Sequence, residues 1–112
     1  MRVFIQHENG LMDANSVIDI VAMATNGGQV GLRSAIDENA QVAARIGSPA
    51  SPLPGNDAKA AAKSVGADLV LAMETAAHSA KIHGTNVIDF DRGSGKWRIT
   101  SLGKTATRPI ES

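Results

Sequence analysis

The sequence contains no cysteine and few aromatic residues, and both absences limit what the chain can do. Without cysteine it has no disulfide framework, no thiolate metal site and no cysteine nucleophile. Aromatic residues make up 3% of the chain and comprise Phe4, Phe90 and Trp97. The core must therefore come from Ala, Val, Ile, Leu and Met, which bury little area per residue when alanine is common. We expect such a domain to rely partly on a partner or on self-association.

Long hydrophobic runs are also missing from the sequence. The first apolar run, Val3 to Ile5, has three residues, whereas a signal-peptide core or a membrane span needs many more. We therefore expect a cytoplasmic protein without a membrane partner. Its 112 residues, with 43% hydrophobic and 20% charged side chains, predict a small soluble domain over residues 1–102. Residues 103–112 are expected to form a partly ordered basic tail.

The charges sum to zero but are unevenly distributed. Residues 1–91 carry six basic and ten acidic side chains, whereas residues 92–112 carry five basic side chains against Glu111 alone. The basic residues of this end are Arg92, Lys96, Arg98, Lys104 and Arg108. Such asymmetry can mark a segment that meets a partner, so these five residues are the predicted partner-binding set.

The first half of the chain predicts one strand followed by two helices. Val3 to Ile5 is short, apolar and rich in β-formers, and Glu8 to Gly10 forms the turn after it. Apolar residues at helical spacing predict a helix from Asp13 to Asn26, with a glycine pair as its stop. The same pattern predicts a second helix from Ser34 to Ile46. The three prolines of residues 48–56 then predict a stiff extended loop.

Residues 57–83 allow two interpretations. In the first, a helix from Ala58 to Val65 ends at Gly66, Leu69 to Ala72 forms a buried strand, and another helix follows. In the second, one helix runs through Gly66 to His83. Periodicity alone does not separate a short buried strand from a buried turn of helix, and a mid-helix glycine costs about 1 kcal/mol. We favour helix, strand, helix.

The end of the chain predicts a β-hairpin with a specific register. The strands are Val87–Asp91 and Lys96–Thr100, and a turn over Arg92–Gly95 fixes which residues face each other. The predicted pairs are Asp91 with Lys96, Phe90 with Trp97, Asp89 with Arg98, and Ile88 with Ile99. Opposite charges then share one face and apolar groups the other, which stabilises a hairpin. The predicted fold is thus α/β or α+β, with three to four strands in a small sheet, three to four helices and a C-terminal hairpin.

Two histidines, His78 and His83, follow Glu74 closely and raise the question of a metal site. On a helix, His83 lies roughly 140° from His78, so one ion cannot easily bind both. Asp89 and Asp91 are better explained as partners of Arg98 and Lys96. The sequence therefore predicts no metal site, and it contains neither GxGxxG nor a P-loop, so no cofactor is expected.

Three functional hypotheses remain. The favoured one is a small non-enzymatic binding module that acts through protein contact, either by self-association as a homo-oligomer or by docking on a larger complex. The second is a nucleic-acid-associated protein that uses the basic C-terminal end. The third is a small acid–base enzyme with His7 and Glu74 at the carboxyl ends of two strands.

Overall fold

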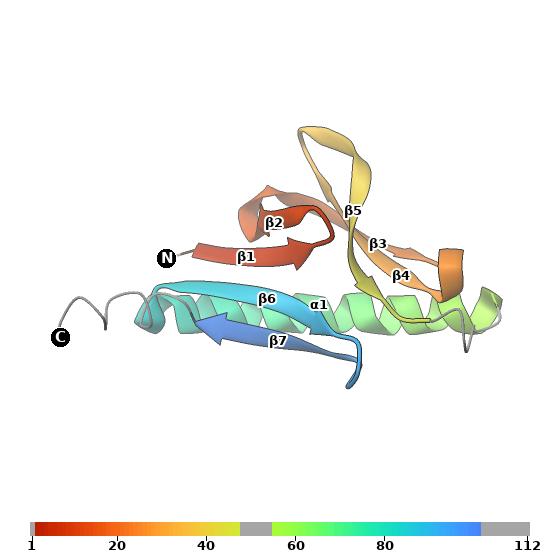
Figure 1. Ribbon diagram of the computed structural model, residues 1–112. Helices are drawn as coiled ribbons and strands as arrows, with labels where there is room; N and C mark the ends of the chain where they lie inside the picture. Colours follow the sequence, from red (N-terminus) through yellow and green to blue (C-terminus); the bar gives the residue numbers. More distant parts are fainter. Residues whose placement is uncertain (1, 48–54, 102–112) are drawn as a thin grey trace.

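The computed structural model describes residues 2–47 and 55–101, which form seven strands, one long helix and two 3-10 turns (Figure 1). In chain order these are β1 (Arg2–His7), β2 (Gly10–Asp13), η1 (Ala14–Ser16), β3 (Val17–Met23), η2 (Thr25–Gly27), β4 (Gln29–Ser34), β5 (Asp37–Arg45), α1 (Gly55–His83), β6 (Thr85–Asp91) and β7 (Lys96–Ser101). The expected extended loop and basic tail lie mostly or wholly outside the described residues.

The strands form two sheets, which are joined where β1 ends beside β5. Sheet A has the order β2-β1-β6-β7, with β1 and β6 parallel and the other neighbours antiparallel. Sheet B is the antiparallel set β3-β4-β5. The amide of Glu8, just after β1, donates to the carbonyl of Val42 in β5 at 2.9 Å and so links the sheets. Figure 1 shows α1 extending along nearly the whole molecule beside strands of both sheets.

Helix α1 is one continuous helix because a single stripe of small and apolar side chains packs against both sheets. The buried positions recur every three or four residues and include Ala58, Ala62, Val65, Leu69, Ala76 and Ala80. Gly66 is buried within this helix, and a Cβ atom added to it would lie 3.5 Å from Ile20 Cγ2 of β3, an ordinary contact distance. The favoured helix, strand, helix interpretation is therefore wrong, and residues 69–72 are helical.

The core lies between this stripe and the inner faces of the sheets. Its largest fully buried apolar side chains are Ile5, Leu32, Leu69, Ile88 and Val30. Phe90 and Trp97 pack edge to face with ring centroids 5.1 Å apart, and the indole Nε1 donates to the Val65 carbonyl at 2.9 Å. The two large aromatic rings therefore join sheet A to the middle of α1.

The predicted helices over 13–26 and 34–46 are wrong. Residues 17–23 and 37–45 are strands β3 and β5, which flank β4. Val17, Ile18, Ile20 and Val21 are β-branched and fit a strand as well as a helix, so the helical spacing was ambiguous. Pairing with β4 and packing on α1 stabilise the strand conformation of these residues. The fold is therefore mixed α+β with two sheets and one helix in the described chain, not one small sheet with three to four helices.

Other local predictions are confirmed. The predicted first strand lies within β1, and Glu8 and Asn9 form the two-residue turn that leads into β2, a strand that was not predicted. Strands β6 and β7 pair in the predicted register at all four positions. The amide of Gly95 donates to the carbonyl of Asp91 at 2.8 Å, which closes a four-residue loop.

Candidate functional site

A groove of about 750 Å³ lies between β3 and the C-terminal half of α1. Its walls come from η1 and β3 on one side and from α1 on the other, with Val3 of β1 also contributing. The apolar lining residues are Val3, Ala14, Val17, Ile18, Ile20, Val70, Met73, Ala77 and Ala80, and the polar ones are Asn15, Asp19, Glu74 and Lys81. The groove is therefore a mainly apolar surface with a polar edge.

The groove depends on the irregular edge of sheet B. Strand β3 is one of the two outer strands of that sheet, and its register with β4 shifts between Val17 and Asp19. This β-bulge leaves Ile18 without a partner residue on β4, and the side chain is 60% exposed. Across the groove, Val70 of α1 is 45% exposed. Both walls thus present a branched aliphatic side chain to solvent.

The polar edge of the groove carries both signs of charge. Asp19 forms an ion pair of 3.6 Å with Arg33 of β4, and both side chains are about half exposed. Glu74 and Lys81 are exposed on α1. These charges surround the apolar lining without filling it, so a bound apolar segment would leave them in contact with water.

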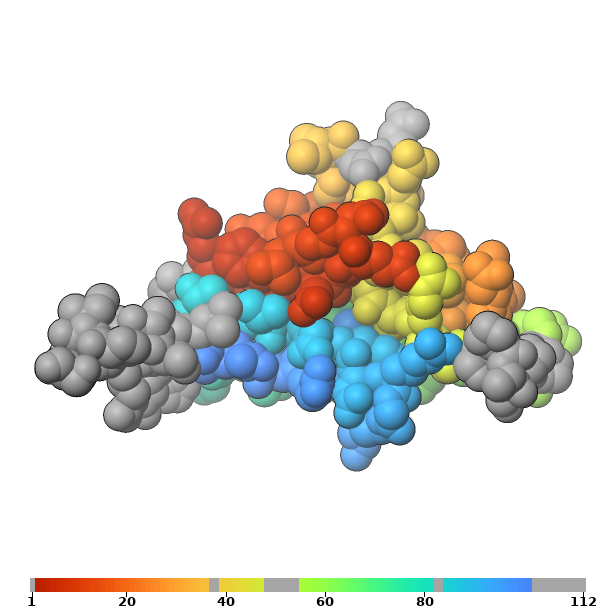
Figure 2. All heavy atoms as spheres, in the orientation of Figure 1, coloured from red at the N-terminus to blue at the C-terminus, as the bar shows by residue number. Residues whose placement is uncertain are grey.

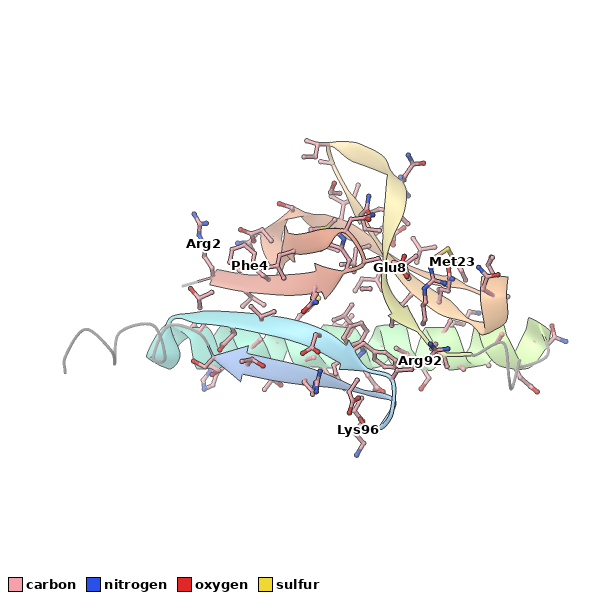
Figure 3. The ribbon with its side chains drawn as sticks, in the orientation of Figure 1. Arg2, Phe4, Glu8, Met23, Arg92 and Lys96 are labelled. Atoms are coloured by element: carbon pink, nitrogen blue, oxygen red, sulfur yellow. The ribbon has the colours of Figure 1, made fainter. Side chains whose placement is uncertain are left out.

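A second hollow, of about 280 Å³, lies at the carboxyl ends of β1 and β6. It is lined in part by His7, Glu8, Arg45, Asp89 and Arg92. Figure 3 shows Glu8 and Arg92 beyond the ends of these two strands. Parallel strands often place ligand-binding groups at this edge, as the sequence predicted for His7. We call this hollow the charged cleft.

Several polar side chains of this cleft already have hydrogen-bond partners within the chain. Arg45 Nε donates to Glu8 Oε1, and this hydrogen bond lowers the pKa of Glu8 and raises that of Arg45. Arg92 Nη2 donates to the Gly47 carbonyl. The Nδ1 atom of His7 accepts the amide hydrogen of Asn9 at 3.2 Å. The cleft is therefore a polar junction between the two sheets.

The structure does not bring the predicted acid–base pair into one hollow. His7 lines the charged cleft, whereas Glu74 lines the groove. Glu74 lies within α1 and does not follow a strand. The enzyme hypothesis placed both residues at strand ends, so its geometric premise is not met.

The predicted basic set is spread over several environments. Arg98 forms an ion pair with Asp89 at 2.5 Å, which raises the pKa of Arg98. Lys96 lies opposite Asp91 and points away from the body of the protein in Figure 3. The pKa of Asp91 is lowered because its carboxylate accepts hydrogen bonds from the Ser94 hydroxyl and the Gly93 amide. The outer face of the hairpin is therefore mixed in charge.

Two members of that set, Lys104 and Arg108, lie outside the described residues. Within the described ranges no three His, Cys, Asp or Glu side chains are grouped closely enough to hold a metal ion. Nor is any described helix both long and apolar enough to cross a membrane.

Comparison with known proteins adds no relative. No family model, curated protein or solved structure matches the chain. Any functional argument therefore depends on the geometry of this chain.

The groove was not predicted, although one feature of the sequence indicated it. In a single helix, Val70 and Leu71 lie outside the buried stripe that includes Leu69 and Ala76, and they are 45% and 61% exposed. Apolar residues off the buried stripe of a helix indicate a surface available for contact. The interpretation of residues 69–72 as a buried strand already explained the continuous apolar run, so the exposure of Val70 and Leu71 was not expected.

Proposed function

We propose that this chain is a protein-interaction module that binds an apolar segment of a protein partner in the groove between β3 and α1. The observation that carries the proposal is the groove itself, which is large, mainly apolar and open to solvent. Contact surfaces between proteins have apolar centres with polar surroundings, and this groove has that distribution. Covering Ile18 and Val70 would remove apolar area from water.

The position of β3 supports an extended partner segment. Strand β3 is one of the two outer strands of sheet B, and among the described residues no strand pairs with its outer edge. Peptides often bind such edges through backbone hydrogen bonds and place alternate side chains in adjoining apolar pockets. The groove along β3 provides such a pocket.

The other two hypotheses gain less support. Arg98 is already paired with Asp89, which offsets part of the positive charge that nucleic-acid binding would require. Arg92 keeps its charge, but its guanidinium is held by the Gly47 carbonyl. His7 and Glu74 line separate hollows, which weakens the enzyme hypothesis. The expected cytoplasmic location stays a prediction.

The experiment uses a peptide library displayed on phage and selected against the immobilised protein. Peptides that bind the groove should lose affinity about tenfold or more for the Ile18→Asp variant, because a carboxylate would stand in the apolar opening. The matched control is Leu11→Asp on β2, since Leu11 is 53% exposed and does not line the groove.

Circular dichroism would verify that both variants fold. The proposal fails if no apolar peptide is selected, or if Ile18→Asp and Leu11→Asp affect the selected peptides equally.

A further inference from the structure

One wall of the groove lies in the same row of sheet A as the last residue of β7. Val3, which lines the groove, pairs with Asn86 of β6, and Asn86 pairs with Ser101. Figure 1 shows β1, β6 and β7 one below another at this end, where α1 also ends, and Figure 2 shows the atoms of these strands in the same order. Two strand spacings, or about 10 Å, therefore separate Ser101 from the groove.

The chain that follows β7 is long enough to reach the groove and run along it. Residues 102–112 follow Ser101, and in a fully extended form they span up to about 36 Å. The helical wall of the groove, from Lys81 back to Val70, is about 16 Å long. A segment that starts at Ser101 can therefore cross to the groove and still follow the whole of this wall.

The groove presents a carboxylate that has no partner among the described residues. Glu74 is exposed on α1 and forms neither an ion pair nor a hydrogen bond with any of them. The other acidic residue of the lining, Asp19, is already paired with Arg33. Lys81, the basic residue of the lining, lies about 10 Å further along α1. A basic side chain that enters the groove would therefore find Glu74 available beside the apolar wall.

The sequence after β7 matches the spacing of charge and apolar surface along this wall. Arg108 and Ile110 are two residues apart, which is about 7 Å in an extended segment. Glu74 and Val70 are four residues apart on α1, which is about 6 Å. Pro109 restricts Arg108 to extended conformations, so the segment loses less conformational freedom when it binds.

We propose that residues 105–110 bind in the groove of their own chain. Arg108 then pairs with Glu74. Ile110 covers Val70. The order agrees with the direction of the chain, since a segment that enters at the end of α1 reaches Glu74 before Val70. Because the ion pair is exposed, it selects the register and contributes little to the stability of the fold.

This contact would regulate the interaction module. The inference rests on the proposed function, because the partner segment and residues 105–110 compete for the same groove. A short connection to β7 holds the segment at an effective concentration of about 1 mM, so even weak contacts fill the groove. A partner must displace it in order to bind.

Cysteine trapping tests the contact, because the chain has no cysteine of its own. The full chain carries Ile110→Cys together with Val70→Cys and is oxidised with oxidised glutathione. We expect an intramolecular disulfide whose yield does not change on dilution. The matched control replaces Val70→Cys with Leu71→Cys, since Leu71 is the next residue of α1, is 61% exposed and does not line the groove. The control should give about tenfold less product.

Charge reversal tests the register of the segment. In the protein with cysteines at 70 and 110, Arg108→Glu should slow disulfide formation about threefold or more. Adding Glu74→Arg should restore the rate, because the ion pair forms again with its charges exchanged. Lys104→Glu is the matched control and should not lower the rate, since residue 104 precedes the segment that binds the groove.

Peptide binding shows whether the contact competes with a partner. Groove-selected peptides should bind the Arg108→Glu protein about threefold more tightly than the wild type, because the competing segment is released. Peptides that bind both proteins equally would overturn the competition. Circular dichroism would verify that the variants fold.

The outcomes separate the two proposals. Equal trapping at residues 70 and 71, a yield that falls on dilution, or a loss that Glu74→Arg does not reverse would overturn the contact within one chain. If peptides still bind the groove in that case, the interaction module stands. Trapping at residue 70 without any groove-binding peptide would leave the contact standing and overturn the proposed function.

Discussion

Gly27 and Gly47 lie against each other where β4 begins and β5 has ended. A Cβ atom on Gly47 would stand 2.5 Å from the carbonyl oxygen of Gly27 and 2.7 Å from its Cα. Nearby, the amide of Ile46 donates to the carbonyl of Gly28 at 2.9 Å. This close backbone contact joins the start of β4 to the segment after β5 at one end of sheet B. The start of α1 lies beside it, because a Cβ on Gly28 would contact the Ala58 carbonyl.

Replacing Gly47 with alanine should therefore destabilise the protein. The atoms that the new methyl group would meet are backbone atoms, which cannot rotate away, so we expect a loss of about 1 to 3 kcal/mol. Urea denaturation would measure it. Gly93→Ala is the control, because its nearest neighbour would be a side-chain oxygen of Asp91 at 3.5 Å. Equal losses in both variants would show that the close contact is not the cause.

Replacing Gly66 with alanine should instead stabilise the protein. Alanine is favoured over glycine within a helix by about 1 kcal/mol, and the added Cβ would lie 3.5 Å from Ile20 Cγ2, an ordinary contact. Gly66→Ala should thus raise the free energy of unfolding by about 0.5 to 1 kcal/mol. Gly66→Leu should lower it, because a larger side chain would collide with Ile20. A destabilised alanine variant would contradict the packing described for α1 and β3.

Acid should weaken the junction between the sheets through Glu8. The pKa of Glu8 is lowered from its ordinary value of 4.5 by the hydrogen bond from Arg45. A carboxylate with a depressed pKa in the folded state stabilises the protein above its unfolded pKa, and that stability is lost as the pH falls through the folded pKa. We expect Glu8→Gln to flatten the fall of the urea midpoint between about pH 5 and pH 3.

Glu74→Gln is the matched control for the pH experiment. Glu74 is exposed on α1 and does not take part in the junction between the sheets. The assignment of the effect to Glu8 would be refuted if Glu74→Gln flattened the curve as much as Glu8→Gln.

Asn86 should be sensitive to a single change of atom type. It is fully buried in β6, and its Nδ2 donates to the Ala76 carbonyl of α1 at 2.8 Å. Asn86→Asp would replace that donor with a carboxylate oxygen facing a carbonyl oxygen, at a cost of about 3 kcal/mol or more at neutral pH. The deficit relative to wild type should shrink in acid, where a protonated aspartate can donate again. A deficit that does not change with pH would argue against this hydrogen bond.

Local sequence was sufficient for the hairpin at the end of the chain. Asp89 faces Arg98 and Phe90 faces Trp97 as predicted, because a loop of four residues determines which positions meet. The first strand and its turn were predictable for the same reason. These features depend on residues close together in sequence, so patterns of charge and apolarity report them directly.

Long-range packing determined the secondary structure of β3, β5 and α1. Their sequences fit more than one periodicity, and the choice depends on contacts between distant segments, such as Ile20 against Gly66 and Glu8 with Val42. The groove likewise needs the bulge at Ile18 and the helix residues around Val70 to come together. The composition of the core and the register of one hairpin thus follow from local sequence alone. The conformations of β3, β5 and α1, and the groove, depend on the packing of two sheets on one helix. The free energy gained by burying apolar side chains depends on the whole arrangement and not on any one segment.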